Sequence, residues 1–210
     1  MTPRPILLAA GRSSRFEDGH KLLAPLLGAP VVAHALGALI GAGLGRPLVV
    51  LGARGDAVRE ALDAAFAPDA FETLVNPRPA EGMGTSLALA ARASLGTPIL
   101  LALGDMPCLT ASDHRAVAAA LDPSDPLAVA RGGAVGKAGH PVAFGPGWAE
   151  RLAALQGDAG AASLLRGRPV ALVPLEPASQ IDVDTRAALS RAGRVVAARP
   201  NPLAIPARPL

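Results

Sequence analysis

Short apolar runs alternate with helix-forming segments along most of this chain, and this alternation constrains the fold more than any other feature. We expect strands at residues 6–9, 48–51, 73–75, 98–103, 127–130 and 170–173, and helices at residues 31–42, 56–66, 87–94, 112–121, 148–155, 160–165 and 185–192. A glycine-rich stretch at 132–139 is expected to form a mobile turn. Strand and helix thus follow each other at short spacing, which predicts βαβ units and a parallel sheet.

The length and composition fit a single domain of this type. The chain has 210 residues, half of them apolar, with aromatics at 2%. Ala, Leu and Val make up most of the apolar residues, which suits helices packed on a parallel sheet, whereas a β-sandwich would be richer in aromatic residues. We predict one Rossmann-like α/β domain of three layers with a mostly parallel central sheet over residues 1–198, followed by a poorly ordered proline-rich tail at 199–210.

Charge, cysteine content and hydropathy argue against several functional classes. The formal net charge is +3 and the arginines are scattered singly, so we expect small phosphorylated ligands and no nucleic-acid partner. The single cysteine, Cys108, excludes an internal disulfide and fits a reducing cytoplasm. Residues 1–11 lack the pattern of a secretion signal, and no apolar run has membrane-spanning length. We therefore predict a cytoplasmic protein with no membrane partner.

The first apolar run ends in a loop of small residues that suits phosphate. Leu8-Ala9-Ala10-Gly11-Arg12-Ser13 presents backbone N–H groups after a strand, and Arg15 and Lys21 add cationic donors. Together they predict a cradle for a triphosphate. The loop matches neither G-x-G-x-x-G nor G-x-x-x-x-G-K-[ST], so neither a dinucleotide fold nor a P-loop is indicated. The alternative is an ordinary strand-to-helix turn with solvated arginines.

Carboxylates suited to Mg²⁺ occur in two other places. Asp105 lies two residues beyond the apolar run 98–103, at the edge where open α/β sheets bind ligands. Asp182 and Asp184 alternate with apolar residues and would project from the same side of an extended segment. Because Mg²⁺ prefers one or two carboxylates together with phosphate oxygens and water, Asp105 and one of this pair can hold it. The alternative is that these residues only cap local structure: Asp105 would cap the turn that follows it, and Asp184 or Thr185 would be the N-cap of the last helix.

Glycine-rich segments complete the set of candidate site residues. Gly82-Met83-Gly84-Thr85-Ser86 brings the backbone to the start of a helix, where a base or ribose can approach closely, although a plain helix start is the alternative. His140 lies in a glycine-bounded turn, and a lone histidine is more often structural than catalytic. Gly157-Asp158-Ala159-Gly160 is either a turn or a loop that binds the acceptor.

The order of these segments resembles the molybdenum cofactor nucleotidyltransferases, especially their cytidylyltransferase branch, over about residues 5–192. The matching segments are Leu8-Ala9-Ala10-Gly11 with Arg15-Phe16 and Lys21-Leu22-Leu23, Asn76 with Glu81-Gly82-Met83-Gly84-Thr85-Ser86-Leu87, Gly104-Asp105-Met106-Pro107, Gly139-His140-Pro141, Gly157-Asp158-Ala159-Gly160 and Asp182-Val183-Asp184-Thr185. The resemblance implies a fold of the nucleotide-diphospho-sugar transferase type. One departure is Ala162, which stands where relatives often carry an arginine and favours a different acceptor.

The resemblance also implies a role for each segment. Arg15, Lys21 and Asp105 would be catalytic, and Asp105 and Asp184 would bind Mg²⁺. The nucleotide would contact Leu8, Ala9, Ala10, Gly11, Arg12, Ser13, Asn76, Gly82, Gly84, Thr85 and Ser86. The acceptor would contact His140, Asp158 and Gly160.

The activity implied is in-line attack by an acceptor phosphate on the α-phosphorus of a nucleoside triphosphate, with pyrophosphate leaving and no protein nucleophile. CTP is favoured over GTP because Ala9-Ala10-Gly11 matches the cytidylyl form of the loop. The acceptor would be the phosphate of molybdenum cofactor (molybdopterin), and a molybdenum enzyme would receive the product. Two alternatives stand beside this one: a nucleotidyltransferase for a sugar or polyol phosphate, and a catalytically silent nucleotide- or cofactor-binding partner of a molybdenum enzyme.

Overall fold

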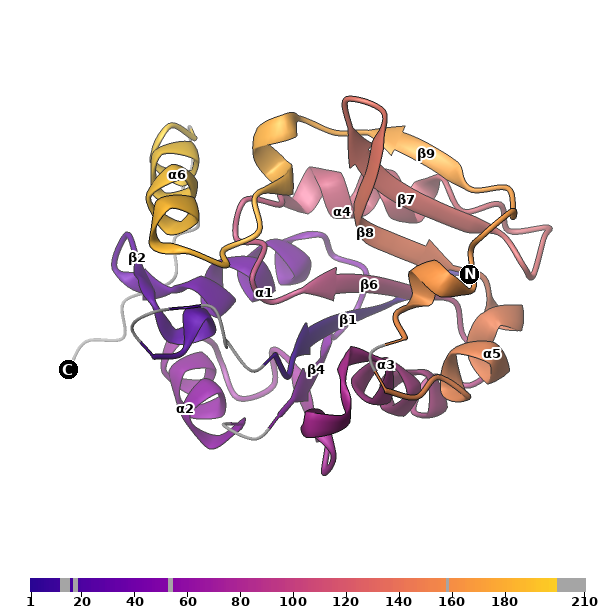
Figure 1. The fold of residues 1–210 in the computed structure, drawn as a ribbon, viewed down its shortest axis with the longest axis horizontal. Helices are drawn as coiled ribbons and strands as arrows, with labels where there is room; N and C mark the ends of the chain where they lie inside the picture. The colour runs from indigo at the N-terminus through magenta and orange to yellow at the C-terminus, as the bar shows by residue number, and fades with distance from the viewer. Residues whose placement is uncertain (12–15, 17–18, 53–54, 158, 200–210) are drawn as a thin grey trace.

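Strands and helices alternate in the computed structural model, which describes residues 1–199 except 12–15, 17–18, 53–54 and 158 (Figure 1). The strands are β1 (Arg4–Ala9), β2 (Pro25–Leu26), β3 (Ala29–Pro30), β4 (Leu48–Leu51), β5 (Glu72–Val75), β6 (Ile99–Leu103), β7 (Val129–Ala134), β8 (Lys137–Phe144) and β9 (Ala171–Pro174). The α-helices are α1 (Val31–Gly41), α2 (Gly55–Ala65), α3 (Met83–Arg92), α4 (Ala111–Ala119), α5 (Ala149–Ala153) and α6 (Arg186–Ala197). Short 3₁₀ helices occur at Lys21–Leu23, Pro79–Glu81, Pro146–Trp148, Ala161–Ser163 and Pro177–Gln180.

Seven strands form the central sheet, in the order β5-β4-β1-β6-β8-β7-β9. β8 runs antiparallel to both of its neighbours, β6 and β7, and the other pairs are parallel. The carboxyl ends of β1, β4 and β6 therefore lie at one edge of the sheet, where the start of β8 also lies. The predicted mostly parallel α/β fold is confirmed.

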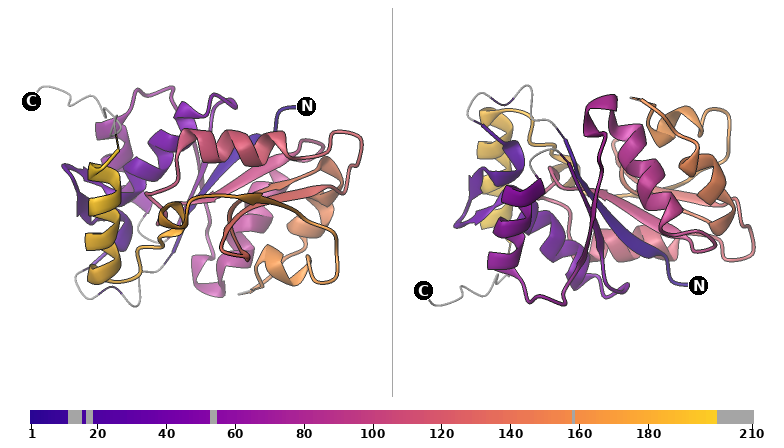
Figure 2. Two further views of the ribbon diagram at one scale, coloured as in Figure 1. Left: turned by 90° about the horizontal axis from the view of Figure 1, so that it is seen from above. Right: turned by 90° about the horizontal axis from the view of Figure 1, so that it is seen from below.

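Helices cover both faces of this sheet (Figure 2). Successive residues of β1 point to opposite faces, so Leu7 packs in a core with α1 and α2, whereas Ile6 and Leu8 pack in a second core with α3 and α5. Because each strand residue meets a helix layer on one side or the other, the run 6–9 is continuously apolar and buried. The three layers expected from composition follow from this arrangement.

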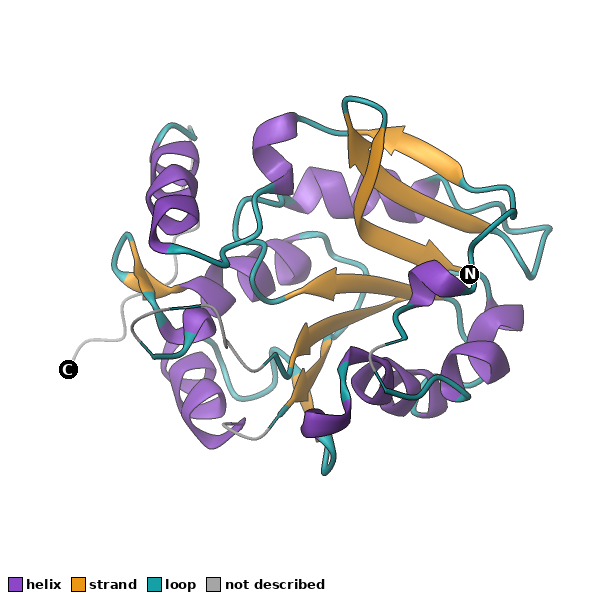
Figure 3. Cartoon of the chain, in the orientation of Figure 1, coloured by secondary structure: helices purple, strands orange, loops and turns teal. Residues whose placement is uncertain are grey.

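A third, smaller core lies under α6. The helix packs Ala192 and Val196 with Leu26 and Val31, near the β2–β3 hairpin, and with buried Val183 (Figures 1 and 3). The hairpin was not expected from the sequence because each of its strands has two residues. This core holds the segment before α6 against the main domain.

Two sequence-based expectations need correction. The helix predicted at 87–94 begins at Met83, because Gly82, with φ of 115°, is its N-cap in place of Thr85 or Ser86. The stretch 132–139, predicted as a mobile turn, lies mostly in β7 and β8, which meet in a tight hairpin with Gly133 paired to Ala138. Glycine is needed there because a Cβ on Gly132 would lie 2.7 Å from the carbonyl oxygen of His140.

Among the helices that the structure describes, none combines the length and apolar character that crossing a bilayer requires. Residues 200–210 of the predicted tail lie outside the described part of the chain.

Candidate active site

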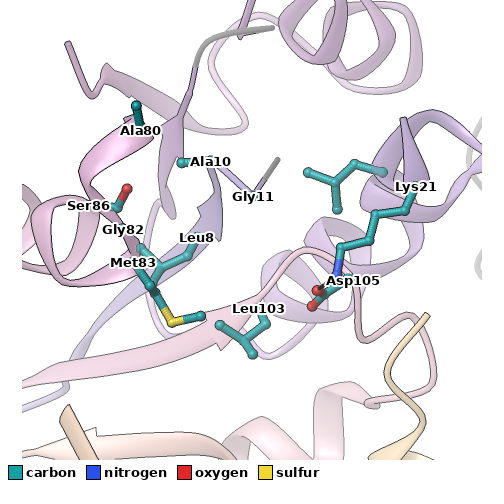
Figure 4. A pocket seen from close by; sticks show the side chains of 11 residues that line it. Leu8, Ala10, Gly11, Lys21, Ala80, Gly82, Met83, Ser86, Leu103 and Asp105 are labelled. Carbon is teal, nitrogen blue, oxygen red and sulfur yellow. Dashed lines mark ion pairs between the residues drawn. The ribbon is translucent and has the colours of Figure 1, made fainter. Parts of the chain in front are cut away.

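A cavity of about 390 Å³ opens at the carboxyl edge of the sheet, between the end of β1 and the start of α3. Figure 4 shows Lys21 directed at Asp105 on one side of the cavity, with Ala80, Gly82 and Ser86 across from them. Among the described residues, the cavity is lined by Leu8, Ala10, Gly11, Lys21, Leu22, Ala80, Gly82, Met83, Ser86, Leu103 and Asp105. Loop residues after β1 and β6 thus share one hollow with the helix that follows β5, as expected for a ligand site in an open α/β sheet.

Three carboxylates converge beside this cavity. One ligand oxygen from each of Asp105, Asp182 and Asp184 lies within 4.8 Å of the others. The Nζ atom of Lys21 lies 2.5 Å from the nearest oxygens of Asp105 and of Asp184, and 3.8 Å from Asp182 Oδ1. The lysine therefore neutralises part of an acidic cluster whose members come from distant parts of the sequence.

The cluster suits a divalent cation by its chemistry. The second carboxylate oxygen of Asp105, Oδ1, is buried and has no hydrogen-bond partner among the described residues. A buried acceptor without a partner is costly unless a cation or donor reaches it. Hard cations such as Mg²⁺ take oxygen ligands of this kind, so Asp105, Asp182 and Asp184 form a donor set that fits one.

Electrostatics in the cluster perturb the ionisable groups. Burial, and then the charge of Asp105, raises the pKa of the Asp182 carboxyl to about 6. Burial lowers the pKa of Lys21, but the charge and hydrogen bond of Asp105, the hydrogen bond of Asp184 and the charge of Asp182 outweigh it and leave that pKa raised. Burial, and then the charge of Arg131, lowers the pKa of His140 to about 4 against the opposing effect of Asp105. His140 is therefore neutral at pH 7, while Lys21 is charged.

Backbone contacts bring the late acidic segment to Asp105. The Val183 N–H donates to the Asp105 carbonyl oxygen at 3.0 Å, and the Val183 side chain is fully buried. Thr185 caps α6, since its side chain accepts from the Ala188 N–H at 3.1 Å. The hydroxyl of Thr185 therefore performs the capping that was the alternative role for Asp184, whose carboxylate contacts Lys21.

The start of α3 is fixed by side-chain and loop contacts. Buried Asn76 donates from Nδ2 to Thr85 Oγ1 and to Ser86 Oγ, both at 2.9 Å. The Gly84 N–H donates to the Gly157 carbonyl at 3.0 Å, and a Cβ on Gly84 would lie 2.7 Å from that oxygen and from the Ala159 carbonyl. Close approach of this loop to the helix is what requires glycine at position 84.

The predicted site residues therefore separate into groups. The residues that line the cavity or join the acidic cluster are Leu8, Ala10, Gly11, Lys21, Gly82, Ser86, Asp105 and Asp184. Ala9 is packed in the core, whereas Asn76, Thr85 and Gly84 support the start of α3. Gly160 comes shortly after Gly157, whose carbonyl accepts from the Gly84 N–H, and the charge of Asp105 acts on the pKa of His140. Arg12, Ser13, Arg15 and Asp158 lie outside the described residues.

Sequence reasoning missed some apolar members of the cavity and two polar neighbours. Met83 and Leu103 line the cavity, but an apolar residue at a strand end or helix start carries no signal of ligand contact. Asp182 was considered as a metal ligand but not selected over Asp184, although its alternation with Asp184 was the available signal. Gln180 contacts the backbone of His140, and nothing in its local sequence indicates this.

Comparison with known families assigns the chain. The model of the MobA-like NTP transferase domain matches residues 5–175. The chain belongs to this family.

Relatives of this MobA-like domain differ in length and in name. Bifunctional protein GlmU of Rhizorhabdus wittichii is 35% identical over 141 residues, which cover 63% of this chain but 30% of that relative. CMP-5'-(3-aminopropyl)phosphonate synthase of Streptomyces rubellomurinus is 33% identical over 136 residues, 60% of this chain and 22% of that protein. The chain thus spans less than a third of these two relatives. Nicotine blue oxidoreductase of Paenarthrobacter nicotinovorans is 32% identical over 176 residues, 78% of this chain and 81% of that protein.

Solved structures share the fold of this MobA-like domain over nearly its whole length. A nucleotidyl transferase from Methanothermobacter is similar with a TM-score of 0.80 and 25% identity, over 94% of this chain and 99% of that one. Rv0371c of Mycobacterium tuberculosis, in a complex with manganese, gives a TM-score of 0.74 and 26% identity, over 92% of this chain and 99% of that one. The MobA-like domain therefore has the nucleotide-diphospho-sugar transferase fold and belongs to a family of NTP transferase domains.

Proposed function

We propose that this nucleotidyltransferase transfers a nucleoside monophosphate, with CMP favoured, from the triphosphate to the phosphate of molybdenum cofactor (molybdopterin), with release of pyrophosphate. The observation that carries the proposal is the convergence of Asp105, Asp182, Asp184 and Lys21 beside a cavity lined by the loop after β1. Such an arrangement supplies charge to phosphates rather than a nucleophile. It suits displacement at phosphorus by an oxygen of the acceptor.

The protein residues would position and neutralise the reactants. The Ala10–Gly11 backbone and the start of α3 would hold the nucleotide in the cavity, and Arg12, Ser13 and Arg15 are proposed to extend the phosphate contacts. An oxygen of the acceptor phosphate, already deprotonated at neutral pH, attacks the α-phosphorus, and the bond between the α-phosphorus and the bridging oxygen breaks as pyrophosphate leaves. The flexible, charged side chain of Lys21 can turn from the carboxylates toward the phosphates.

Mg²⁺ is the cofactor proposed for the acidic cluster. Asp105 and Asp184, joined by Asp182, would hold it, and when bound it would neutralise negative charge on the phosphates. The manganese complex of the Mycobacterium tuberculosis structure supports a divalent cation in this fold.

The preference for CTP rests on two supports. Ala9-Ala10-Gly11 matches the cytidylyl form of the loop in the molybdenum cofactor nucleotidyltransferases. One relative is named for a CMP-linked phosphonate, which is compatible with a cytidine nucleotide. A molybdenum enzyme would receive the product, and His140 and the 157–160 loop are the segments we assign to the acceptor.

The decisive experiment supplies each nucleoside triphosphate with Mg²⁺ and either molybdenum cofactor or a panel of sugar and polyol phosphates. Pyrophosphate release and the mass of the product are measured. We expect release with CTP and molybdenum cofactor, at a rate that Asp105→Asn lowers by about two orders of magnitude or more, since a preorganised charge contact is lost. If pyrophosphate is released with a sugar or polyol phosphate but not with molybdenum cofactor, that compound replaces molybdenum cofactor as the acceptor in this proposal. Tight nucleotide binding without release in any mixture would contradict the proposed activity.

A further inference from the structure

The segment that carries Asp182 and Asp184 has its own anchor in the fold. The chain returns from β9, at one edge of the sheet, to the end of β6 before it enters α6 (Figure 1). Two hydrogen bonds hold this returning segment to the rest of the domain. Ser179 Oγ donates to Asp113 Oδ2 of α4 at 3.1 Å, and the Val183 N–H donates to the Asp105 carbonyl oxygen. Gln180 lies between them, next to the acidic residues in sequence.

The Gln180 side chain makes both of its bonds to one backbone residue. The His140 N–H donates to Gln180 Oε1 at 3.0 Å, and Gln180 Nε2 donates to the His140 carbonyl oxygen at 2.7 Å. Exchange of an N–H and a C=O with one residue is the pairing that a neighbouring antiparallel strand would provide. The amide of Gln180 thus extends the sheet locally, by a side chain instead of a strand.

The position of His140 explains why this pairing bears on the acidic cluster. Leu101 of β6 pairs with Val142 of β8, so His140 lies two residues nearer to the edge of the sheet at which β6 ends and Asp105 follows. Gln180 therefore attaches the acidic segment to β8, while Val183 attaches it to the turn after β6. Asp182 and Asp184 lie on either side of this second attachment.

Gly139 leaves the room that this contact needs. A Cβ at position 139 would overlap Gln180 Oε1, so a side chain there would expel the amide from its place. Arg131 Nε also donates to the Gly139 carbonyl at 3.0 Å, which fixes the backbone on the other side of the pairing. The glycine of Gly139-His140-Pro141 is thereby explained by the glutamine that lies against it.

We infer that Gln180 is a positioning residue for the metal-binding carboxylates: its amide pairs with the His140 backbone and holds Asp182 and Asp184 at the separation from Asp105 that a divalent cation requires. This inference rests on the proposed function, because it assumes that the acidic cluster holds a cation. Groups that orient metal ligands without touching the metal are typically worth about 10- to 100-fold in metal affinity.

The test is a Mn²⁺ titration of the full chain, followed by electron paramagnetic resonance, without nucleotide or acceptor. Gln180→Ala should weaken Mn²⁺ binding by about 10- to 100-fold, and the exposed Gln156, changed to Ala, is the matched control with unchanged affinity. Gln180→Glu keeps the shape and the acceptor for the His140 N–H but loses the donor. Its added negative charge alone would strengthen cation binding, whereas loss of positioning weakens it.

A double-mutant comparison separates positioning from a general loss of structure. Gly139→Ala should weaken Mn²⁺ binding as Gln180→Ala does, and the double variant should be no weaker than either single variant, because both remove the same contact. If Gln180→Ala does not fold, Gln180→Glu and Gly139→Ala carry the test. An affinity within about twofold of the wild type for the folded Gln180 variants, or tighter binding by Gln180→Glu, would overturn the inference. Failure to release pyrophosphate would refute the proposed function and leave this titration unaffected.

Discussion

Lys21→Met removes the one cation that the described residues place within the acidic cluster, and its effect can be worked from the distances there. The Nζ atom of Lys21 lies 2.5 Å from an oxygen of Asp105 and from one of Asp184. At an effective dielectric constant of about 20, each such attraction is worth about 4 kcal/mol or more, and the desolvation of the buried ammonium offsets part of it. Solvent also screens part of this attraction, because the Asp184 side chain is 36% exposed, although that of Lys21 is 11% exposed. We therefore expect the variant to lose about 2 to 3 kcal/mol of unfolding free energy at pH 8, which lies below the full Coulomb value.

Thermal melting measures this loss. For a chain of this size, 1 kcal/mol shifts the melting temperature by about 2–4 °C, so the midpoint should fall by about 4–12 °C. Added Mg²⁺ should return most of the loss, because the ion replaces the missing ammonium among the carboxylates. Near pH 4 the difference between variant and wild type should shrink as the carboxylates take up protons.

The other lysine of the chain provides the control. Lys137 is exposed at the tip of the β7–β8 hairpin, and Lys137→Met should leave the midpoint unchanged with or without Mg²⁺. A melting temperature for Lys21→Met equal to that of Lys137→Met, or one that Mg²⁺ does not raise, would refute the electrostatic reasoning.

Three further predictions concern stability. The pKa of Asp182 is raised to about 6, so between about pH 4 and 6 the folded state holds a proton that the unfolded state has lost. The wild-type free energy of unfolding should therefore fall as pH rises through this range. In urea unfolding Asp182→Asn should show a smaller fall, and an equal dependence on pH in the two proteins would count against the buried cluster. His114 is buried with both ring nitrogens unpartnered among the described residues, and its pKa is lowered to about 4. Wild type should therefore lose stability as pH falls from about 6.5 to 4, whereas His114→Leu should be flatter in this window and about 1 kcal/mol more stable at pH 7; a less stable variant in the same urea series would contradict this. Trp148 is 1% exposed, and its ring centroid lies 5.7 Å from that of Phe144. Trp148→Ala should therefore lower the free energy of unfolding by about 3–5 kcal/mol in chemical denaturation. A loss below about 1 kcal/mol would show that packing around position 148 does not depend on the ring.

Sequence patterns predicted most of the sheet because its strands are covered on both faces. The strand at Leu48–Leu51 agrees with the prediction residue for residue, since every position there is buried and apolar. The β7–β8 hairpin was mispredicted because glycine has a low strand propensity. In this hairpin glycine serves close packing, a tertiary property that propensity does not contain.

The candidate site was predictable where it depends on strand ends. Asp105 and Asp184 were expected to meet, and their carboxylates lie together in the acidic cluster. The place of Lys21 among these acids was not predictable, because a loop has no periodicity from which the direction of a side chain follows. Gln180 could not be found for a related reason: its partner is the backbone of a residue 40 positions away, and any residue has such a backbone.

The contact between Lys21 and Asp184 joins residues 163 positions apart. This separation bears on when the site forms during synthesis and folding. During synthesis the loop after β1 emerges early, whereas Asp182 and Asp184 emerge after every strand that the structure describes. Contacts this distant in sequence carry a high loop-closure cost and form late in folding. A growing chain can therefore build its sheet before it can assemble the acidic cluster, and the capacity to bind a divalent cation should be among the last native properties that a newly made molecule acquires.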